Sequence, residues 1–233
     1  MYASLGQAIQ ENCGIEYVQR TITEDRNTLN TPDADKRTPF HWACSMGKLD
    51  IAEYLLKQVD IKADEKDEAG WTPLMVAICN KAIPDSFIET LMERSDVNIE
   101  TTTRGGQTCL HYASGKGRLN IVQKLCERSP RLIRTRDLQG QQPLHRAAAV
   151  GNSNVVKYLL SQKCPLNASD SFGFTALHFA LAEGHPDIAI DLIKSNADTL
   201  RTDKEGHTAL DVCMDRSIRQ EFIGRCKQEG LDL

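Results

Sequence analysis

The chain has 233 residues, with 28 Lys+Arg against 32 Asp+Glu, a formal net charge of −4 and 40% hydrophobic residues. These values are ordinary for a folded chain and exclude disorder of the whole chain. The slightly negative net charge also argues against a general polyanion binder, because such a protein needs clustered cations. No apolar run approaches the roughly 18 residues of a membrane span, and the N-terminal residues do not have the pattern of a secretory signal. We therefore expect neither a nucleic-acid nor a membrane partner.

One four-residue motif recurs in phase along the chain. Its copies begin at residues 38, 72, 108, 142, 175 and 208, with spacings of 34, 36, 34, 33 and 33 residues. This period and a T-P-L-H signature are typical of ankyrin repeats, so the sequence predicts an all-α ankyrin-repeat solenoid of about seven repeats of ~33 residues. The copies are Thr38-Pro39-Phe40-His41, Thr72-Pro73-Leu74-Met75, Thr108-Cys109-Leu110-His111, Gln142-Pro143-Leu144-His145, Thr175-Ala176-Leu177-His178 and Thr208-Ala209-Leu210-Asp211.

In chain order, a signature-less first repeat precedes these six, and the last repeat is degenerate, as terminal repeats with one solvent face are. In the other five, a Thr or, once, a Gln at the helix N-cap opens the first helix, Pro follows the N-cap in three copies, and a left-handed Gly ends the helix in four. The long spacing places its extra residues at 81–84, between two helices. We predict one domain over 1–233, with repeats at about 1–32, 33–66, 67–102, 103–136, 137–169, 170–202 and 203–233.

The residues that could carry chemistry each fit a structural role. His41, His111, His145 and His178 recur once per repeat, which favours packing histidines over metal ligands. The acidic run 64–68 is expected on a solvated fingertip, and no catalytic or phosphate-binding motif is present. Eight scattered cysteines without a Cys-x-x-Cys pair predict buried, reduced thiols. We expect no enzyme activity, no cofactor and no metal.

Function should then reside on the surface, where fingers and first-helix ends form the concave face of such a stack. Trp71, Leu138, Phe172 and Phe174 are large apolar groups at positions expected to face solvent, which favours an interface. Alternatively, these side chains pack on the neighbouring finger. The candidate partner-binding residues are Asp35, Arg37, Trp42, Met46, Glu68, Trp71, Arg104, Tyr112, Lys116, Arg146, Phe172 and Phe174.

Arg146 occupies a slot that holds an apolar residue in the other signature copies. It could pair internally with a finger carboxylate such as Asp137 or Asp170, or it could hold a partner's carboxylate by bidentate hydrogen bonds. Charge is also uneven along the chain. Residues 1–117 carry 12 Lys+Arg and 18 Asp+Glu, whereas residues 118–233 carry 16 and 14. Such a gradient could orient a partner of opposite charge polarity along the stack, or it could be a chance result of sequence drift without function.

Particular strings go beyond the general signature. RTPFHWACSMGKLDIAEYLL, DEAGWTPL and QQPLHRAAAVGN closely resemble the second, third and fifth repeats of the gankyrin family, the ankyrin-repeat non-ATPase regulatory subunits 10 of the 26S proteasome. The likeness spans the chain. It includes the signature-less first repeat and the arginine in the fifth signature.

The resemblance implies an assembly chaperone of the proteasome regulatory particle that clasps the C-terminal domain of one AAA-ATPase subunit. It implies cytoplasmic and nuclear localisation, and we expect a monomer when free. The implied groove residues are Asp35, Arg37, Trp42, Glu68, Trp71, Tyr112 and Arg146.

One departure concerns the L-x-C-x-E string of mammalian members, which bind retinoblastoma-type proteins through it. The matching place here, residues 179–183, reads FALAE and lacks the cysteine, so that activity is not implied. The alternative function is an ankyrin-repeat inhibitor or adaptor of a kinase or transcription factor.

Overall fold

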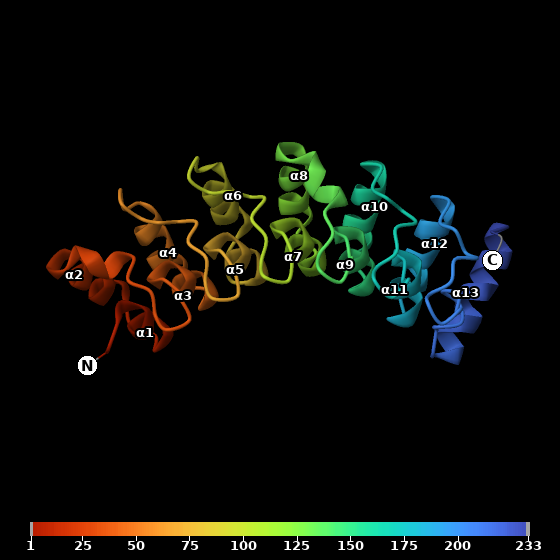
Figure 1. The fold of residues 1–233 in the computed structure, drawn as a ribbon, viewed down its shortest axis with the longest axis horizontal. Helices are drawn as coiled ribbons and strands as arrows, with labels where there is room; N and C mark the ends of the chain where they lie inside the picture. The colour runs from red at the N-terminus through yellow and green to blue at the C-terminus, as the bar shows by residue number, and fades with distance from the viewer. Residues whose placement is uncertain (1, 232–233) are drawn as a thin grey trace. The chain divides into compact units, whose positions relative to one another are not determined.

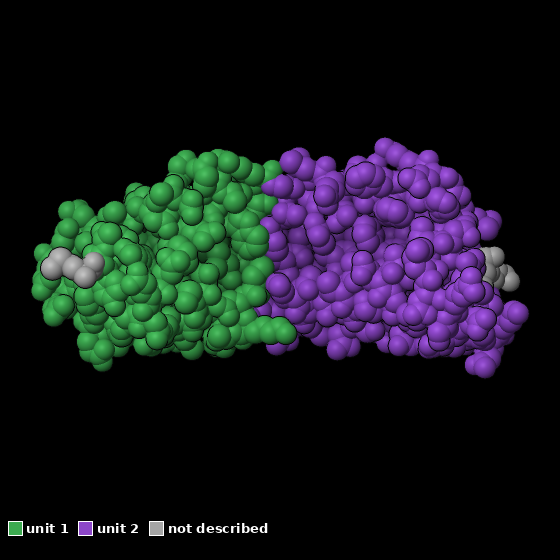
Figure 2. Space-filling model, turned by 90° about the horizontal axis from the view of Figure 1, so that it is seen from below, with its two compact units in different colours: residues 1–104 green, residues 105–233 purple. Residues whose placement is uncertain are grey.

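The computed structural model describes residues 2–231 and divides into two compact units, Met1–Arg104 and Gly105–Leu233 (Figure 2). Both units consist of antiparallel helix pairs joined by finger-like turns (Figure 1). Among the described residues, extended pairing is limited to two isolated bridges at the feet of fingers. The predicted all-helical ankyrin-repeat class is confirmed, while the single-domain boundary and the repeat limits remain predictions.

Unit 1 has an inner row of first helices, in which α3 contacts both α1 and α5, and an outer row of second helices. The inner helices are α1 (Leu5–Gln10), α3 (Pro39–Ser45) and α5 (Pro73–Cys79). The outer helices are α2 (Ile15–Glu24), α4 (Leu49–Leu56) and α6 (Asp85–Glu93), and the short 3₁₀ turn η1 spans Arg26–Leu29. The core lies between the rows, where residues such as Phe40, Ile51 and Leu74 are fully buried.

Unit 2 repeats the arrangement and adds a long last helix. Its inner row is α7 (Cys109–Lys116), α9 (Pro143–Ala149) and α11 (Ala176–Ala182), in which α9 packs on both neighbours. Its outer row is α8 (Leu119–Arg128), α10 (Ser153–Ser161) and α12 (Pro186–Lys194). The 3₁₀ turn η2 covers Pro130–Arg134, and α13 (Arg216–Glu229) packs on α12.

The signature histidines connect successive repeats, which confirms their structural role. Thr38 N–H donates to His41 Nδ1 at 3.1 Å, and His41 Nε2 lies 3.1 Å from the carbonyl oxygen of Trp71 in the next repeat. A backbone amide bonded to Nδ1 fixes the tautomer that carries its proton on Nε2. His111 and His178 make the same pair of contacts within unit 2, and His145 differs only in that its Nε2 lies 3.0 Å from the carbonyl oxygen of Ala168, just before the next finger. Each imidazole is therefore a neutral bridge from its own N-cap to the following finger.

The last signature copy departs from the prediction, because Ala209–Val212 forms turns instead of a helix. Asp211 replaces the bridging histidine and accepts hydrogen bonds from the backbone and hydroxyl of Thr208. Four residues later, Asp215 accepts from the amides of Ser217 and Ile218 and so starts α13. The segment between these two caps is too short for a first helix. The predicted lengthened loop is present at 80–84, between α5 and α6.

Candidate functional site

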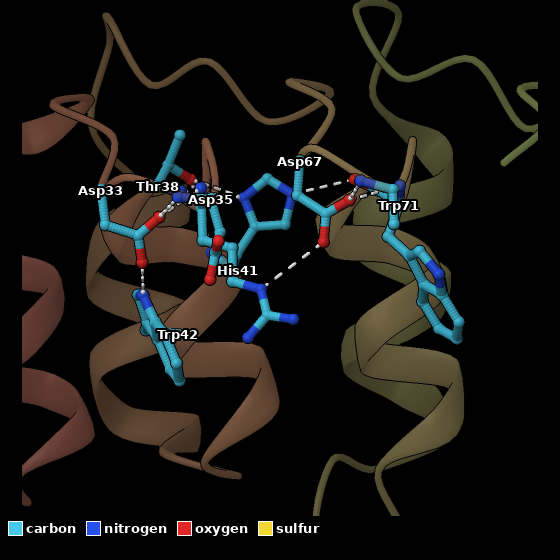
Figure 3. A network of polar contacts seen from close by, with 9 residues as sticks. Asp33, Asp35, Thr38, His41, Trp42, Asp67 and Trp71 are labelled. Carbon is cyan, nitrogen blue, oxygen red and sulfur yellow. Dashed lines mark hydrogen bonds and ion pairs between the residues drawn. The ribbon is translucent and has the colours of Figure 1, made fainter. Parts of the chain in front are cut away.

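The fingers of unit 1 are organised by a buried or half-buried aspartate at the start of each. Asp33 Oδ1 accepts the amides of Asp35 and Arg37 at 3.0 and 2.9 Å, while Oδ2 accepts the indole N–H of Trp42 at 2.8 Å. This arrangement ties the finger to α3 and fixes the orientation of the Trp42 ring (Figure 3). Trp42 is thus held from within the protein, and its ring is half-buried.

Asp67 repeats the pattern one finger later. Its Oδ1 accepts the amides of Ala69 and Trp71 at 2.9 and 2.8 Å, and its Oδ2 lies 3.5 Å from Arg37 Nε (Figure 3). The expectation that residues 64–68 form a solvated fingertip is wrong for Asp67, which is only 8% exposed. Its hydrogen bonds and the adjacent guanidinium compensate for the loss of water around the carboxylate. Within the same run, burial raises the pKa of Asp64 above its ordinary value.

Arg37 is held between two groups of its own unit. Its guanidinium carbon lies 5.1 Å from the centre of the Trp42 ring, and Nε pairs with Asp67 on the other side. The side chain is nevertheless 41% exposed. An arginine positioned by an aromatic face and a carboxylate loses little rotamer freedom when it binds a further carboxylate.

Beside Arg37 lies a cleft of about 490 Å³, lined in part by Trp71, Val76, Cys79 and Lys81. The indole of Trp71 points away from the Asp67 carboxylate (Figure 3), and the side chain is half-buried. Trp71, expected to face solvent, is therefore only partly exposed. The cleft combines apolar walls with two cations, which suits an apolar partner side chain flanked by an acidic one.

The tips of the unit 1 fingers carry charges that pair with one another. Glu68 forms ion pairs with Lys36, at 3.0 Å, and with Arg104. These two cations, Lys36 first, lower the pKa of Glu68 below its ordinary value. Asp35 is exposed, and its carbonyl oxygen accepts the amide of Glu68 at 2.8 Å, so neighbouring fingers are hydrogen-bonded.

In unit 2 the internal alternative for Arg146 is observed, with Asp137 as its partner. Arg146 Nη2 lies 3.0 Å from Asp137 Oδ2, and Asp137 Oδ1 accepts the amides of Gln139 and Gln141. The carboxylate of Asp137 is 1% exposed, whereas the arginine side chain is 34% exposed. One guanidinium carries five N–H donors, so this contact leaves room for a second carboxylate from a partner.

The four apolar residues expected at the surface divide into two classes. Leu138 is 78% exposed and Phe172 is 59% exposed. Phe174, like Trp71, is half-buried, because its ring packs 5.6 Å from His178 and 5.8 Å from Phe179. Internal packing therefore accounts for Phe174, and the solvent-facing interpretation is retained for Leu138 and Phe172.

The structure distributes the predicted residues over the two units. In unit 1 Arg37 lies between the Trp42 ring and Asp67, and the backbone amide of Trp71 donates to Asp67. Met46 lies at the far end of α3 and is 42% exposed. In unit 2, Tyr112 donates to Gln107 at 2.9 Å, and Lys116 is exposed at the end of α7. The sequence interpretation missed the organising role of Asp33 and Asp67, although the recurrence of an aspartate at five of the six finger starts was the available signal.

All eight cysteines are free thiols, seven of them buried. Burial raises the pKa of Cys126 to about 12 and that of Cys164 to about 11, so both remain protonated at neutral pH. Between residues 2 and 231, no cluster of three metal-ligating side chains occurs. In the same range, no helix is long and apolar enough to cross a bilayer.

Comparison with known proteins identifies the repeats and their relatives. Ankyrin-repeat family models match residues 5–101 and 83–170 (three copies) and 156–193 (many copies). The chain is 64% identical over 233 residues to an ankyrin repeat-containing protein of Schizosaccharomyces pombe, covering 100% of both chains. It is 34% identical over 224 residues to the probable 26S proteasome regulatory subunit p28 of Saccharomyces cerevisiae, covering 94% of this chain and 96% of that protein. A shorter match, 41% identical over 59 residues, relates 25% of the chain to the human 26S proteasome non-ATPase regulatory subunit 10.

Proposed function

Since the chain belongs to the family of ankyrin-repeat proteins that includes the yeast probable 26S proteasome regulatory subunit p28, we propose that it binds a subunit of the proteasome regulatory particle. In the specific form of the proposal, it is an assembly chaperone whose fingers and first helices hold the C-terminal domain of one AAA-ATPase subunit. Full-length similarity to the yeast protein supports the proteasomal partner. The chemistry of the surface supports a folded protein domain as the ligand.

The observation that carries the proposal is the arrangement of Arg37. Its guanidinium is stacked on Trp42, paired with Asp67 and still 41% exposed beside a cleft of about 490 Å³. A preorganised arginine next to an aromatic wall has the composition of an interface hot spot. Arg146 in unit 2 is similarly held by Asp137 and partly exposed. We therefore propose that both arginines accept carboxylates of the partner.

Isothermal titration calorimetry against the isolated C-terminal domains of the proteasomal ATPase subunits tests the proposal. Trp71→Ala should weaken binding by about 2 kcal/mol, because it removes the aromatic wall of the cleft. Tyr54→Ala is the matched control, since Tyr54 is a half-buried aromatic of the same unit on the outer helix α4. Asp35→Lys should mainly slow association and alter its salt dependence, because exposed rim charges steer the encounter.

The proposal fails if the wild-type chain binds none of the ATPase domains. If the wild type binds and both aromatic variants bind equally well, the partner is correct and the cleft of unit 1 is not its site. Thermal melts of each variant, run in parallel, separate loss of binding from loss of folding.

A further inference from the structure

Two fingertips of unit 2 expose large apolar side chains. Leu138 (78% exposed) and Phe172 (59% exposed) lie on successive fingers, each starting with its own aspartate. The amide of Ser171 donates to the carbonyl oxygen of Gln139 at 2.8 Å and joins the two fingers. The next finger is joined in the same way, through Lys204 N–H and the carbonyl oxygen of Phe172 at 2.9 Å. The backbone therefore presents both side chains from one continuous row.

The corresponding tips of unit 1 differ in chemistry. There Glu68 pairs with Lys36 and Arg104, so the exposed groups at the tips satisfy one another. Leu138 and Phe172 instead keep most of their apolar surface in water. Adjacent exposed apolar groups of this size mark interaction sites more often than isolated ones do.

The finger that carries Phe172 is held in place by contacts within the protein. Asp170 Oδ1 accepts the amides of Phe172 and Phe174 at 2.8 and 2.9 Å. The preceding finger approaches so closely that a Cβ on Gly140, whose φ is +77°, would lie 3.0 Å from Ser171 N. Little backbone entropy therefore remains to be lost when the row is covered.

The charges around this row are mainly positive. Asp137, Asp170 and Asp203, at the starts of the three fingers, are buried, so their carboxylates do not face a partner. Arg136 and Lys204 are both exposed, and the Arg136 guanidinium reaches from the Leu138 finger to the carbonyl oxygen of Ser169, at the foot of the Phe172 finger. Glu205 is the exposed acid at the adjacent tip, and its carboxylate lies 3.7 Å from His207 Nδ1.

We propose that Leu138 and Phe172, together with the neighbouring cations Arg136 and Lys204, form a docking site for an apolar patch of the partner domain bordered by carboxylates. This site deepens the proposed function and rests on it, because the occupant is the same ATPase C-terminal domain. It specifies what that domain must present to unit 2: apolar side chains for the two fingertips, with acidic groups beside them for the two cations. Charge complementarity favours acidic over basic groups on the partner at this place.

The test is calorimetric titration of the full chain with the ATPase domain that binds the wild type. Phe172→Ala and Leu138→Ala should each raise Kd at least about fivefold, and the double variant at least about 30-fold, with melting temperatures within about 2 °C of the wild type. Leu200→Ala is the matched control, since Leu200 is 75% exposed in the same unit but lies outside the fingers, and it should stay within about twofold. Lys204→Glu should weaken binding, and the loss should shrink in high salt.

Two outcomes would overturn the proposal, and they differ. If the wild type binds and both fingertip variants stay within twofold, the docking site is refuted while the proposed function stands. If the wild type binds no ATPase domain, the proposed function fails and the docking site fails with it. Binding strengthened by Lys204→Glu would show that the partner presents a basic surface here, which also refutes the inference.

Discussion

Replacing Arg146 by methionine tests whether one side chain both holds a finger and remains available to a partner. Methionine keeps most of the aliphatic length and removes the guanidinium that lies 3.0 Å from Asp137 Oδ2. Asp137 is then a buried carboxylate whose Oδ1 still accepts two amides and whose Oδ2 has lost this donor. A hydrogen bond to a charged group contributes roughly 1.5–3 kcal/mol. Because the arginine is 34% exposed, water can replace it, and we expect a cost of about 1.5 kcal/mol.

Stacked repeats open locally, so the assay should report on this finger rather than on global unfolding. Gln139 and Gln141 donate their amides to Asp137 at 3.0 and 2.8 Å, and their hydrogen exchange measures the stability of the turn. In Arg146→Met, exchange at both amides should accelerate about tenfold, the factor that corresponds to roughly 1.4 kcal/mol. Arg201→Met is the control, since Arg201 pairs with the exposed Asp198 in the same unit and should leave both amides unchanged.

The result that refutes this reasoning is unchanged exchange at Gln139 and Gln141 in Arg146→Met. The contact with Asp137 would then contribute nothing, and the guanidinium would serve a partner alone. Accelerated exchange together with weakened binding of the ATPase domain would support both roles for Arg146. Accelerated exchange with unchanged binding would restrict it to the internal one.

Three further outcomes are expected. Burial lowers the pKa of His111 from 6.5 to about 4, so its neutral form stabilises the fold fully above pH 6.5. As the pH falls towards 4, the free energy of unfolding should decrease by about 3 kcal/mol, because the unfolded state takes up a proton at His111 first. Urea unfolding between pH 7 and 4.5 measures this decrease, which should be smaller in His111→Gln. Lys36 has φ +60°, a left-handed conformation that glycine adopts without strain, so Lys36→Gly should increase the free energy of unfolding by up to about 1 kcal/mol and raise the melting temperature. Loss of the exposed ion pair with Glu68 should make this gain smaller. Ellman's reagent should label Cys79, the half-buried thiol, before the seven buried ones, and Cys79→Ala should abolish this fast phase.

The fold could be predicted because its determinants recur with a fixed period. A Thr or Gln at the N-cap, a histidine three residues later in four copies and a glycine at the finger in five each act through contacts within one repeat or with the next. Their recurrence in phase defines them without reference to distant residues. The prediction of a first helix after Thr208 was wrong, because it did not consider a second helix start close by. Asp215 caps the helix α13 only seven residues after Thr208. Periodicity shows where a helix can begin, not whether a second start lies too close.

Exposure of the candidate site was harder to predict, because it depends on contacts that the period does not encode. Phe172 and Phe174 are two residues apart on one finger, yet the first faces solvent and the second packs against His178. Trp71 occupies the same slot before the N-cap as Phe174 and is also half-buried. That slot lies at the base of the finger, against the first helix. The fingertip slot of Phe172 lies beyond it, so the two positions of this finger differ in burial.

The finger aspartates explain how one scaffold can carry different surfaces. In each of three fingers Oδ1 makes the same two amide contacts, two and four residues ahead. The group that meets Oδ2 differs: it is the Trp42 indole at Asp33, Arg37 at Asp67 and Arg146 at Asp137. Oδ1 therefore fixes the conformation of the turn, and Oδ2 binds and orients a different side chain near the surface in each finger. Two of the three selected groups are arginines that stay partly exposed, so the contact that completes the fold also positions a cation for a partner. Removing the aspartate should then impair both the turn and binding, whereas exchanging the selected side chain should alter binding more than it alters the turn.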